Sequence, residues 1–430
     1  MNNKTFKNNI SWIFLGNLLH SIFTFLLNIF VARIMSKEDY GNINYVFSWI
    51  SFFNSFAILG INNVINKFLN NNQKESNEYL NSAIVMRFIS SIISIICVFF
   101  LILLLENGNT KIIYITLIYS MYFISEIGQI YVYWFRYKRE ANIVAILRII
   151  AFFISASLKI VALLFFKNIY LYTFGIVLET LMFSILLFIS YKNKYGFKMI
   201  FSKAKMKRIL KSSYPFISAS LLITIYAQTD KVMLKNMMSA SEVASYSVAI
   251  TIAGLMGTFA SAVIEGFRPE IISNYKSDKY IYAKRLRQLY CFIFWLCIAY
   301  GFFITIFSKH IITILYGKKY LTSVPALSTI VWYTSFSYFG SANNVYLVAE
   351  NKEKYAQLTT LIGAITNIIL NLFLIPKMGI VGAAFASLVT QFIANFGILI
   401  IVKELRPIVA YMLNGIFFKD VFRKKHQKTK

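Results

Sequence analysis

The chain has 430 residues, of which 58% are hydrophobic and 14% are charged, and its mean hydropathy is +0.62. A soluble domain of this length has too little interior to bury so much apolar surface, so the composition excludes a soluble globular protein and predicts a polytopic membrane protein. The formal net charge of +27 does not indicate nucleic-acid binding, because the cations are dispersed among apolar segments rather than gathered on one soluble domain.

The cysteines and histidines predict neither a disulfide framework nor a metal or cofactor site. The three cysteines lie in apolar runs without a Cys-x-x-Cys pair, and the three histidines are scattered along the chain. The first apolar run, residues 10–35, is longer than the apolar core of a signal peptide and has no small-residue cleavage motif. We therefore expect it to form the first membrane span.

About twelve apolar segments follow one another along the chain, and each has the ~20 residues that a helix needs to cross a hydrocarbon core of ~30 Å. A chain in lipid must satisfy its own backbone hydrogen bonds, and strand-like alternation of polarity is absent, so we expect an all-α fold. The expected spans are residues 10–35, 41–66, 80–105, 112–135, 142–166, 169–191, 213–237, 243–266, 288–308, 323–348, 355–375 and 380–402.

The longest basic stretch divides these spans six and six. Residues 192–211 hold eight Lys and Arg residues and no acid, which is typical of a cytoplasmic segment lying on anionic lipid headgroups. The expected organisation is an N-terminal six-helix lobe at 1–191, a basic cytoplasmic linker at 192–212, a C-terminal six-helix lobe at 213–403 and a basic cytoplasmic tail at 404–430.

The distribution of basic residues between the loops predicts the orientation in the membrane. If the N-terminus is cytoplasmic, the inward segments hold 31 of the 44 Lys and Arg residues and the outward loops hold 7. Basic residues concentrate on the cytoplasmic side of membrane proteins, so both termini are predicted to be cytoplasmic. The other six basic residues lie within spans: Arg33, Arg87, Arg148, Lys159, Lys231 and Lys235.

A weak internal repeat relates the two halves. The stretch "IMSKEDYGNINYVFS" (34–48) matches "MMSASEVASYSVAIT" (237–251), so that Ser36 falls on Ser239. In each stretch a serine is followed three residues later by an acid, which predicts a helix N-cap at the start of a span. Six spans per half would make the lobes parallel repeats, related by a pseudo-two-fold axis along the membrane normal, with a substrate cavity expected between them.

These two stretches and "ITNIILNLFLIPKMGIVGAAFASLVTQ" (365–391) resemble the polysaccharide flippases (Wzx-type transporters) of the multidrug/oligosaccharidyl-lipid/polysaccharide exporter superfamily. The third stretch carries the family's pattern of two Asn four residues apart, then Pro, Gly and Gly-Ala-Ala. Its members here are Asn367, Asn371, Pro376, Gly379 and residues 382–384.

Two further stretches extend the resemblance over nearly the whole chain. "YAQTDKVMLKNMMSASEVASYSVA" (226–249) is similar to the family's seventh helix and the turn that follows, although Ala244 stands where the family often has Gly. "LGINNVINKF" (59–68) is similar to the end of the family's second helix. The resemblance implies two six-helix lobes that work by alternating access. It also implies export of oligosaccharides linked to undecaprenyl pyrophosphate across the bacterial inner membrane, for capsule, lipopolysaccharide O-antigen or related polymers.

Polar stripes inside the spans supply candidate substrate-binding residues. Arg148, Ser155 and Lys159 point within about 20° of the same direction on a helix, because they are seven and eleven residues apart. A cation near the bilayer centre costs ~2.5–3.5 kcal/mol, so these side chains are expected to face a wet cavity. Cations suit a pyrophosphate, and neutral polar side chains suit sugars. The expected substrate-binding residues are Arg148, Ser155, Lys159, Asn28, Thr224, Gln228, Lys231, Lys235, Asn367 and Asn371.

Other interpretations of these residues remain open. The basic residues near span ends could simply reach toward the headgroups, and the Asn and Thr stripes could hold helices together. Four acids lie at membrane depth and could pair with the buried cations: Glu265, nearer a span end, and the three deeper acids Glu126, Glu179 and Asp230. Alternatively, one of the three could bind H+ or Na+ and couple its entry to export.

Two other functions are the alternatives to a flippase. A multidrug/cation antiporter of the same superfamily would favour buried acids over buried bases. A membrane glycosyltransferase or polymerase of polysaccharide assembly would usually show a large external loop with acids, whereas residues 309–322 form a short loop without one. No nucleophile–base set is recognisable, so we expect no enzyme.

The expected partners follow from this interpretation. They are a lipid-linked oligosaccharide, the surrounding membrane lipids and H+ or Na+ as a coupling ion. No nucleic acid is expected. We expect a monomer in the bacterial inner membrane, and association with the polysaccharide polymerase machinery is left open.

Overall fold

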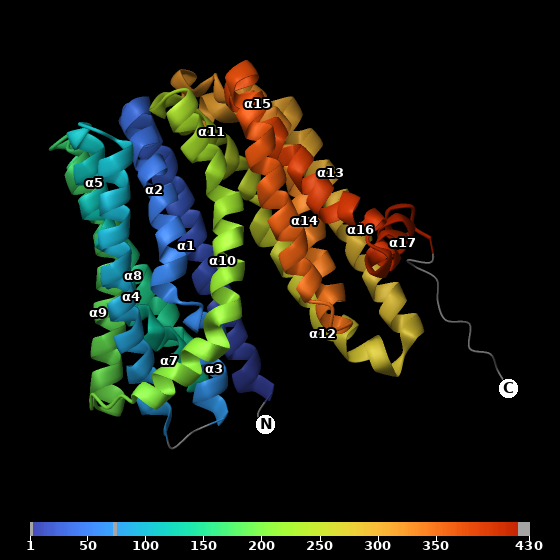
Figure 1. Ribbon diagram of the computed structural model, residues 1–430, viewed down its shortest axis with the longest axis horizontal. Helices are drawn as coiled ribbons and strands as arrows, with labels where there is room; N and C mark the ends of the chain where they lie inside the picture. The colour runs from blue at the N-terminus through green and yellow to red at the C-terminus, as the bar shows by residue number, and fades with distance from the viewer. Residues whose placement is uncertain (1–2, 72–74, 420–430) are drawn as a thin grey trace. The chain divides into compact units, whose positions relative to one another are not determined.

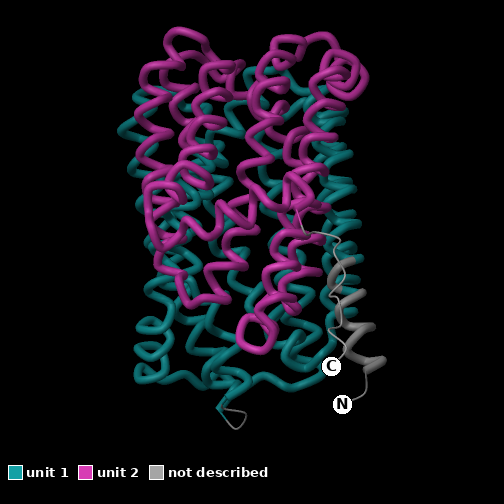
Figure 2. Tube along the Cα trace, turned by 90° about the vertical axis from the view of Figure 1, so that its right-hand side faces the viewer, with its two compact units in different colours: residues 1–228 teal, residues 229–430 magenta. Residues whose placement is uncertain are grey.

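The computed structural model describes residues 3–71 and 75–419, and every regular element in that part of the chain is a helix (Figure 1). The chain forms two compact units, residues 1–228 and residues 229–430 (Figure 2). The boundary falls within one long helix, α10 (Lys203–Met237), which begins in unit 1 and ends in unit 2. The compact units thus divide inside α10, whereas the lobes expected from the sequence divide at the basic stretch before it.

The helices of unit 1 alternate between long spanning helices and short pieces at breaks. Besides the first part of α10, they are α1 (Asn3–Ile34), α2 (Lys37–Ile58), α3 (Ile61–Asn71), α4 (Ser76–Leu105), α5 (Thr110–Ser120), α6 (Tyr122–Ser125), η2 (Glu126–Ile130), α7 (Tyr131–Tyr137), α8 (Ala141–Leu164) and α9 (Ile169–Tyr195).

Unit 2 is built in the same manner. Besides the end of α10, its helices are α11 (Ala240–Gly254), α12 (Met256–Ser277), α13 (Lys279–Leu315), η3 (Lys318–Tyr320), α14 (Ser323–Ala349), α15 (Lys354–Phe392), η4 (Ile393–Gly397), α16 (Ile398–Ile401), η5 (Lys403–Leu405) and α17 (Arg406–Ile416).

Helix α15 contains two membrane spans, not one. The Asn367 side-chain amide donates to the Ser387 hydroxyl at 3.4 Å, yet on a straight helix residues 20 apart would be separated by ~30 Å. The chain therefore reverses between them, at Gly379, where φ is 57° and ψ is −133°. Only glycine adopts this backbone conformation readily, which explains why a glycine follows the helix-disfavouring Pro376.

This reversal brings the number of spans to the predicted value. Ten segments of the described chain are long and apolar enough to cross a membrane, and residues 354–401 count among them as one segment. Separating the two arms of α15 and adding α14, which has 27 residues, makes twelve. The prediction of an all-α polytopic membrane protein with about twelve spans is confirmed.

The second predicted span is broken by a tight turn between α2 and α3. Leu59 and Gly60 both have positive φ, at 54° and 62°. A Cβ on Gly60 would lie 2.8 Å from the Ser213 carbonyl oxygen of α10, so only glycine fits. The single span expected over residues 41–66 is therefore two helices, because Gly60 permits both the turn and the close approach of α10.

The basic linker expected over residues 192–212 is largely attached to the protein. Its last ten residues form the first turns of α10, where Lys205 pairs with Glu75 at 3.2 Å and also with Glu78. Before α10, the Lys198 carbonyl oxygen accepts from the Asn81 amide at 2.7 Å. The start of α4 therefore holds this segment in place, through contacts that its lysine-rich composition does not reveal.

The beginning of the predicted cytoplasmic tail is also folded. Residues 406–416 form α17, and Ile408 and Met412 on it belong to the apolar core of unit 2. A Cβ on Gly415 would lie 2.5 Å from the Arg287 carbonyl oxygen, so α17 packs closely against α13. The end of the predicted tail, residues 420–430, lies outside the described residues.

The two predicted N-caps are confirmed. The Ser36 hydroxyl accepts from the Asp39 backbone N–H at 3.1 Å at the start of α2. The Ser239 hydroxyl accepts from the Glu242 backbone N–H at 3.3 Å at the start of α11. Each cap satisfies a backbone donor that the helix leaves without a partner, so the sequence repeat corresponds to a repeated structural feature.

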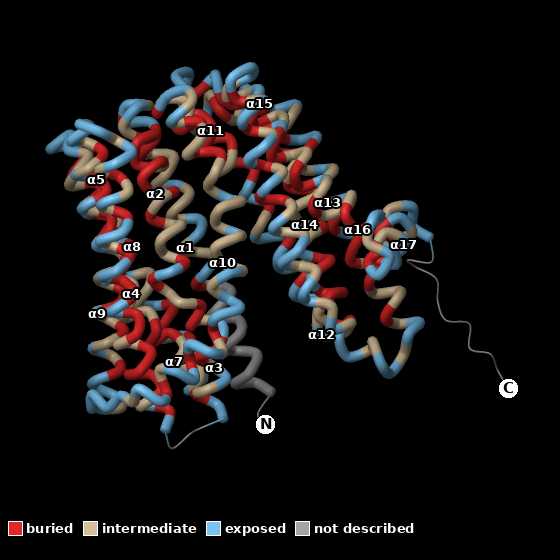
Figure 3. The backbone as a smooth tube through the Cα atoms, in the orientation of Figure 1, coloured by how far each residue is buried: buried red, intermediate tan, exposed pale blue. Residues whose placement is uncertain are grey.

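Each unit has its own apolar core. In unit 1 it includes Ile61, Tyr131 and Trp134, and in unit 2 it includes Tyr290, Phe339 and Met412. Buried and exposed positions alternate along most helices (Figure 3). Many exposed positions carry large apolar side chains, among them Phe100, Ile306 and Phe373. Such an exposed apolar surface is stable in a bilayer and not in water, which agrees with the membrane assignment.

Candidate functional site: a neutral pocket and two carboxylates

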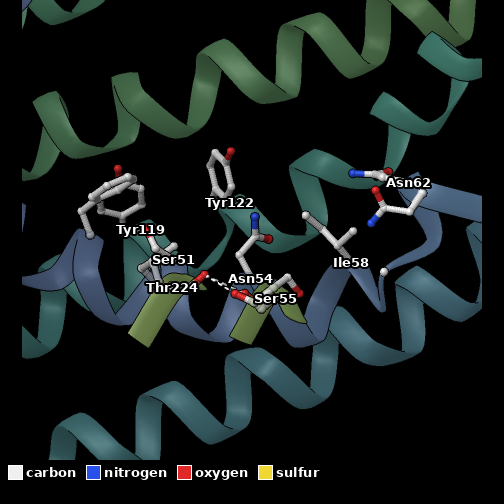
Figure 4. Close-up of a pocket in the computed structure, with 13 residues that line it drawn as sticks. Ser51, Asn54, Ser55, Ile58, Asn62, Tyr119, Tyr122 and Thr224 are labelled. Carbon is white, nitrogen blue, oxygen red and sulfur yellow. Dashed lines mark hydrogen bonds between the residues drawn. The ribbon is translucent and has the colours of Figure 1, made fainter. Parts of the chain in front are cut away.

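One cavity of unit 1 has a volume of about 430 Å³ and an uncharged lining (Figure 4). It lies among α2, α3, α5, α6 and α10, and nine of its thirteen lining residues carry polar side chains or hydroxyls. The lining residues are Phe47, Ile50, Ser51, Asn54, Ser55, Ile58, Gly60, Asn62, Asn63, Tyr119, Tyr122, Ser220 and Thr224.

One face of α2 supplies the polar floor of this pocket. Ser51, Asn54, Ser55 and Ile58 are spaced by three and four residues, so they lie along one side of the helix (Figure 4). The Ser55 and Thr224 hydroxyls are 3.0 Å apart and link α2 to α10. The Asn54 Oδ1 atom is buried and has no hydrogen-bond partner within the described chain. A ligand hydroxyl could satisfy it, since buried polar atoms normally have partners.

A buried arginine, Arg87, forms a hydrogen bond with one of the residues that line the pocket. The Arg87 guanidinium donates to the Asn62 Oδ1 atom and, at 3.4 Å, to the Glu126 backbone carbonyl. Arg87 is only 2% exposed, so it does not reach toward the headgroups, as was considered from its place near a span end. It instead holds Asn62, whose side chain lines the pocket.

The chemistry of the pocket suits an uncharged ligand rich in hydroxyl groups. Asn, Ser and Thr side chains both donate and accept hydrogen bonds, and the Tyr119 and Tyr122 rings add flat apolar surface with a hydroxyl at the edge. No Lys, Arg, Asp or Glu lines this pocket. A volume of about 430 Å³ is within the range typical of small-molecule sites.

The first carboxylate, Glu179 of α9, is half-buried and pairs with basic groups within unit 1. It lies 2.7 Å from the Lys159 ammonium of α8 and 2.8 Å from the His20 ring of α1. The Ser155 hydroxyl is 3.4 Å from the same carboxylate and donates to the Gly175 carbonyl at 2.8 Å. The alternative that the deep acids pair with the deep cations is thus confirmed for Lys159 and Glu179.

The predicted stripe on α8 is therefore split between two environments. Lys159 and Ser155 are buried and engaged with α9, and a Cβ on Gly175 would lie 2.8 Å from the Lys159 side chain. Arg148, the third member, is half-buried and donates to the Asn17 side-chain oxygen at 2.8 Å. The spacing of the three residues places their side chains on one face of α8, but their partners on neighbouring helices differ.

The second carboxylate, Asp230 of α10, lies in unit 2 among neutral donors. The amides of Asn367 and Asn371 on α15 donate to its Oδ1 atom at 3.0 and 2.6 Å. The Ser387 hydroxyl donates to its Oδ2 atom at 2.6 Å, and the Tyr246 hydroxyl of α11 donates to the same atom. Asn367 and Asn371 are fully buried, so in this structure they bind Asp230 and do not line the pocket.

The other predicted site residues lie in several places. Thr224 lines the pocket, and Gln228, one turn later on α10, accepts from the Ser48 hydroxyl at 3.2 Å. Lys231 is buried at 8% exposure, while Asn28 and Lys235 are half-buried. Glu126 lies behind the pocket in contact with a second, smaller cavity that Arg87 also lines.

The sequence interpretation missed most of the pocket. Asn54, Asn62 and Tyr119 were not among the expected binding residues, and neither was His20 as a partner of Glu179. The spacing of Ser51, Asn54 and Ser55 could have indicated a polar face on the second span. The pairing of His20 with Glu179 had no such signal, because 159 residues separate them in the chain.

Comparisons with known proteins place the chain in a family. The family model described as "Polysaccharide biosynthesis protein" matches residues 6–265, and the model MatE matches residues 215–373. The capsular polysaccharide biosynthesis protein CapF of Staphylococcus aureus is 25% identical over 409 residues, which cover 90% of this chain and 96% of CapF.

Solved structures of low sequence identity share the fold. An inward closed structure of the lipid II flippase MurJ has a TM-score of 0.70 at 18% identity, and the match covers 96% of this chain and 93% of that one. An inward-facing multidrug resistance MATE transporter of the MOP superfamily has a TM-score of 0.66 at 13% identity, covering 93% of this chain and 94% of that one. Because the first family model matches more than half of the chain, the protein belongs to the polysaccharide biosynthesis protein family, the polysaccharide-exporter group that the sequence resembles.

Proposed function

We propose that this protein is a flippase for lipid-linked oligosaccharides. It moves an oligosaccharide attached to undecaprenyl pyrophosphate from the inner to the outer leaflet of the bacterial cytoplasmic membrane, by alternating access and with both termini in the cytoplasm. It is a transporter and not an enzyme in this proposal. The cargo supplies a polymer such as capsule.

The observation that carries the proposal is the uncharged polar pocket of unit 1. Sugars offer many hydroxyl groups and flat apolar faces, and this pocket offers amides, hydroxyls and two tyrosine rings in about 430 Å³. The Asn54 side chain lines this pocket, and its Oδ1 atom has no hydrogen-bond partner within the described chain. Family membership supports the same cargo class, since the CapF relative is named for capsular polysaccharide biosynthesis.

Ion coupling is the second part of the proposal, and Asp230 is its best candidate. Glu179 already has two basic partners, Lys159 and His20, whereas the four side chains that donate hydrogen bonds to Asp230 are neutral amides and hydroxyls. A proton or Na+ at Asp230 would remove the acceptor that holds α10, α11 and both arms of α15 together. Its entry or loss would therefore change the packing of those helices.

A multidrug/cation antiporter is the second candidate, favoured by the MatE match over residues 215–373. A cationic drug would need an acid in its binding pocket, and the described pocket has none. Efflux of a cationic dye from cells expressing this protein tests the alternative. Dye efflux by the wild type that Asp230→Asn abolishes would favour the antiporter over the flippase.

The test of the flippase uses a strain that lacks the gene and carries plasmid-borne variants. The strain should lose surface polysaccharide and accumulate the lipid-linked precursor in the inner leaflet, and the wild-type gene should restore both. Asn54→Leu should fail to restore export while keeping normal protein levels, because it replaces a side chain whose oxygen lacks a partner with an apolar one of similar size.

A matched pair on α10 provides the control. Ser220 lines the pocket, whereas Ser218, two residues earlier, is exposed outside it. Ser220→Leu should therefore block export and Ser218→Leu should not. Normal polysaccharide from both Asn54→Leu and Ser220→Leu would reject the pocket as the sugar site, and normal polysaccharide from the deletion strain would reject the function.

A further inference from the structure

A second polar feature of unit 1 brings two arginines together at the junction of α1, α7 and α8. Arg136 at the end of α7 and Arg148 on α8 line one narrow crevice, together with Trp12 and Asn17 of α1. The crevice holds about 10 Å³, room for about one water. Helices α1 and α8 approach closely here, since a Cβ on Gly16 would lie 2.7 Å from the Ala145 Cβ.

Neither arginine forms a salt bridge within the described part of the chain, although the Glu179 carboxylate acts on Arg148 from a distance. No acid within 4.0 Å of Arg136 or Arg148 is found in the described part of the chain, in contrast to Lys159, Lys194 and Lys205 of the same unit. The Arg136 Nε atom is buried without a hydrogen-bond partner. Within the described chain, Arg148 donates a hydrogen bond to the neutral Asn17 side chain. Two guanidiniums that share a crevice also repel one another, so the arrangement favours a bound anion.

Aromatic rings hold both guanidiniums by their faces. The Arg148 Cζ atom lies 5.1 Å from the centre of the Phe183 ring, and the Arg136 Cζ atom lies 5.7 Å from the centre of the Tyr133 ring. Stacking of this kind uses the flat face of the guanidinium. It leaves N–H groups at the edge for in-plane hydrogen bonds, which is the geometry that phosphate oxygens accept in pairs.

We propose that Arg136 and Arg148 form a binding site for the phosphate groups of a lipid. The crevice is too small for a phosphate, so the anion binds at its mouth, against the N–H edges, with the Asn17 amide as a neutral donor beside it. The lipid chain extends along the apolar outer surface of α1 and α8. Lys159, to which the sequence pattern assigned this role, is already committed to Glu179.

Two lipids carry this chemistry. If the proposed function holds, the pyrophosphate of the cargo is one source, and the site then binds the cargo separately from the neutral pocket for sugars. The headgroup of an anionic bilayer phospholipid is the other. A pyrophosphate offers more charge and more oxygen atoms than a phosphodiester, so the paired arginines favour the cargo.

The test measures binding and not transport, so its outcome is independent of the outcome of the export assay. The purified full-length protein in nanodiscs of neutral lipid is titrated with geranylgeranyl pyrophosphate as the probe. Arg136→Gln and Arg148→Gln are compared with Arg139→Gln, an exposed cation of the same loop. Each of the first two should weaken probe binding at least about tenfold, and Arg139→Gln should leave it within about twofold. Inorganic pyrophosphate should displace the probe.

The remaining measurements identify the source and guard against misfolding. Phosphatidylglycerol adducts are counted by native mass spectrometry for the same variants. Weaker probe binding in the two variants assigns the site to a pyrophosphate lipid, and loss of phosphatidylglycerol adducts alone assigns it to bilayer lipid. Unchanged binding of both lipids in both variants would overturn the site. Arg136→Lys and Arg148→Lys, which keep the charge, should recover part of the affinity if either Gln variant folds poorly.

Discussion

Two carboxylates of this protein, Glu179 and Asp230, accept hydrogen bonds from different kinds of side chain, and we assign them different roles. Glu179 is held by Lys159 and His20, so the cluster combines one acid with two basic groups. Asp230 is held by two amides and two hydroxyls. An ion pair of this kind fixes α1, α8 and α9 together, whereas a carboxylate among neutral donors can gain or lose a cation. We therefore assign a structural role to Glu179 and the coupling role to Asp230.

The structural role of Glu179 predicts a strong effect of removing one partner. Glu179→Gln leaves the buried Lys159 ammonium, 7% exposed, without its acid, and should destabilise the protein by about 3 kcal/mol. The double variant Glu179→Gln/Lys159→Met should recover much of that loss, because no buried charge remains. Thermal melting in detergent measures both variants.

The control for these Glu179 variants is a second ion pair with the same distance between its nitrogen and oxygen atoms. Lys194 and Glu140 are also 2.7 Å apart, but the Lys194 side chain is 49% exposed. Lys194→Met should change the melting temperature little, since an exposed pair contributes about 1 kcal/mol or less. A double variant no more stable than Glu179→Gln would show that the pair does not hold the helices together.

The coupling role of Asp230 predicts a change in ion dependence without loss of the fold. Asp230→Asn keeps the size of the side chain and some of its hydrogen bonds, so the protein should still insert and purify. Its flipping of a fluorescent lipid-linked oligosaccharide in proteoliposomes should no longer accelerate when a Na+ or pH gradient is imposed. Glu265→Gln, at an acid 62% exposed, should keep the wild-type response. An unchanged gradient response in Asp230→Asn would remove this residue from the coupling mechanism.

At the level of elements, the most constrained position is the reversal within α15. Gly379 has φ 57° and ψ −133°, a conformation that a side chain strains. Next to it, a Cβ on Gly382 would lie 2.2 Å from the Leu374 carbonyl oxygen. The turn therefore brings the two arms together so tightly that Asn367, Asn371 and Ser387 can all reach Asp230.

This geometry predicts the effect of adding a methyl group at the turn. The Cβ atom added by Gly379→Ala has space around it, with the nearest atom 3.6 Å away. Any loss of stability therefore comes from backbone strain and should lower the free energy of unfolding by about 1–3 kcal/mol. Gly254→Ala, at a helical glycine of α11 with open surroundings, should be neutral or slightly stabilising. Equal melting temperatures for Gly379→Ala and the wild type would contradict the prediction that a side chain at this position strains the backbone.

At the level of the whole molecule, the orientation predicted from basic residues can be tested by labelling. In a variant with Cys97, Cys291 and Cys297 replaced by Ser, single cysteines are placed at Lys377 and Lys198, both exposed. A membrane-impermeant maleimide should label Lys377→Cys in intact cells, and Lys198→Cys only after permeabilisation. The reverse pattern would place the termini outside.

The fold was largely predictable because membrane insertion imposes simple rules. The number of spans could be predicted from the lengths of the apolar segments. The helix caps at Ser36 and Ser239 could be predicted from a local sequence motif. Breaks inside helices were harder to predict. Gly60 lies in an otherwise continuous apolar run, and its need for a glycine comes from the approach of α10, a helix 150 residues later.

The candidate site was predictable only in part, since residue type and helical phase do not identify a side chain's partner. Asn367 and Asn371 were recognised as important, but their hydrogen bonds go to Asp230 and not to the pocket. Thr224 was predicted to lie on a polar face, and it lines the pocket. Asn54 was missed because no charge or family motif marked it, and Asn62 was missed because the stretch 59–68 was recognised only as the end of a helix.

The sequence alone determined the class of protein, the number of spans, the helix caps and the family, because these depend on composition and on residues near one another in the chain. The tertiary structure decided which buried charges are neutralised and where an open, uncharged pocket remains. Lys159 and Arg148 lie eleven residues apart on one helix, yet Glu179 faces only the first. Whether a buried cation in a membrane protein is paired with an acid depends on the helices packed against it. Only the folded chain brings those helices together.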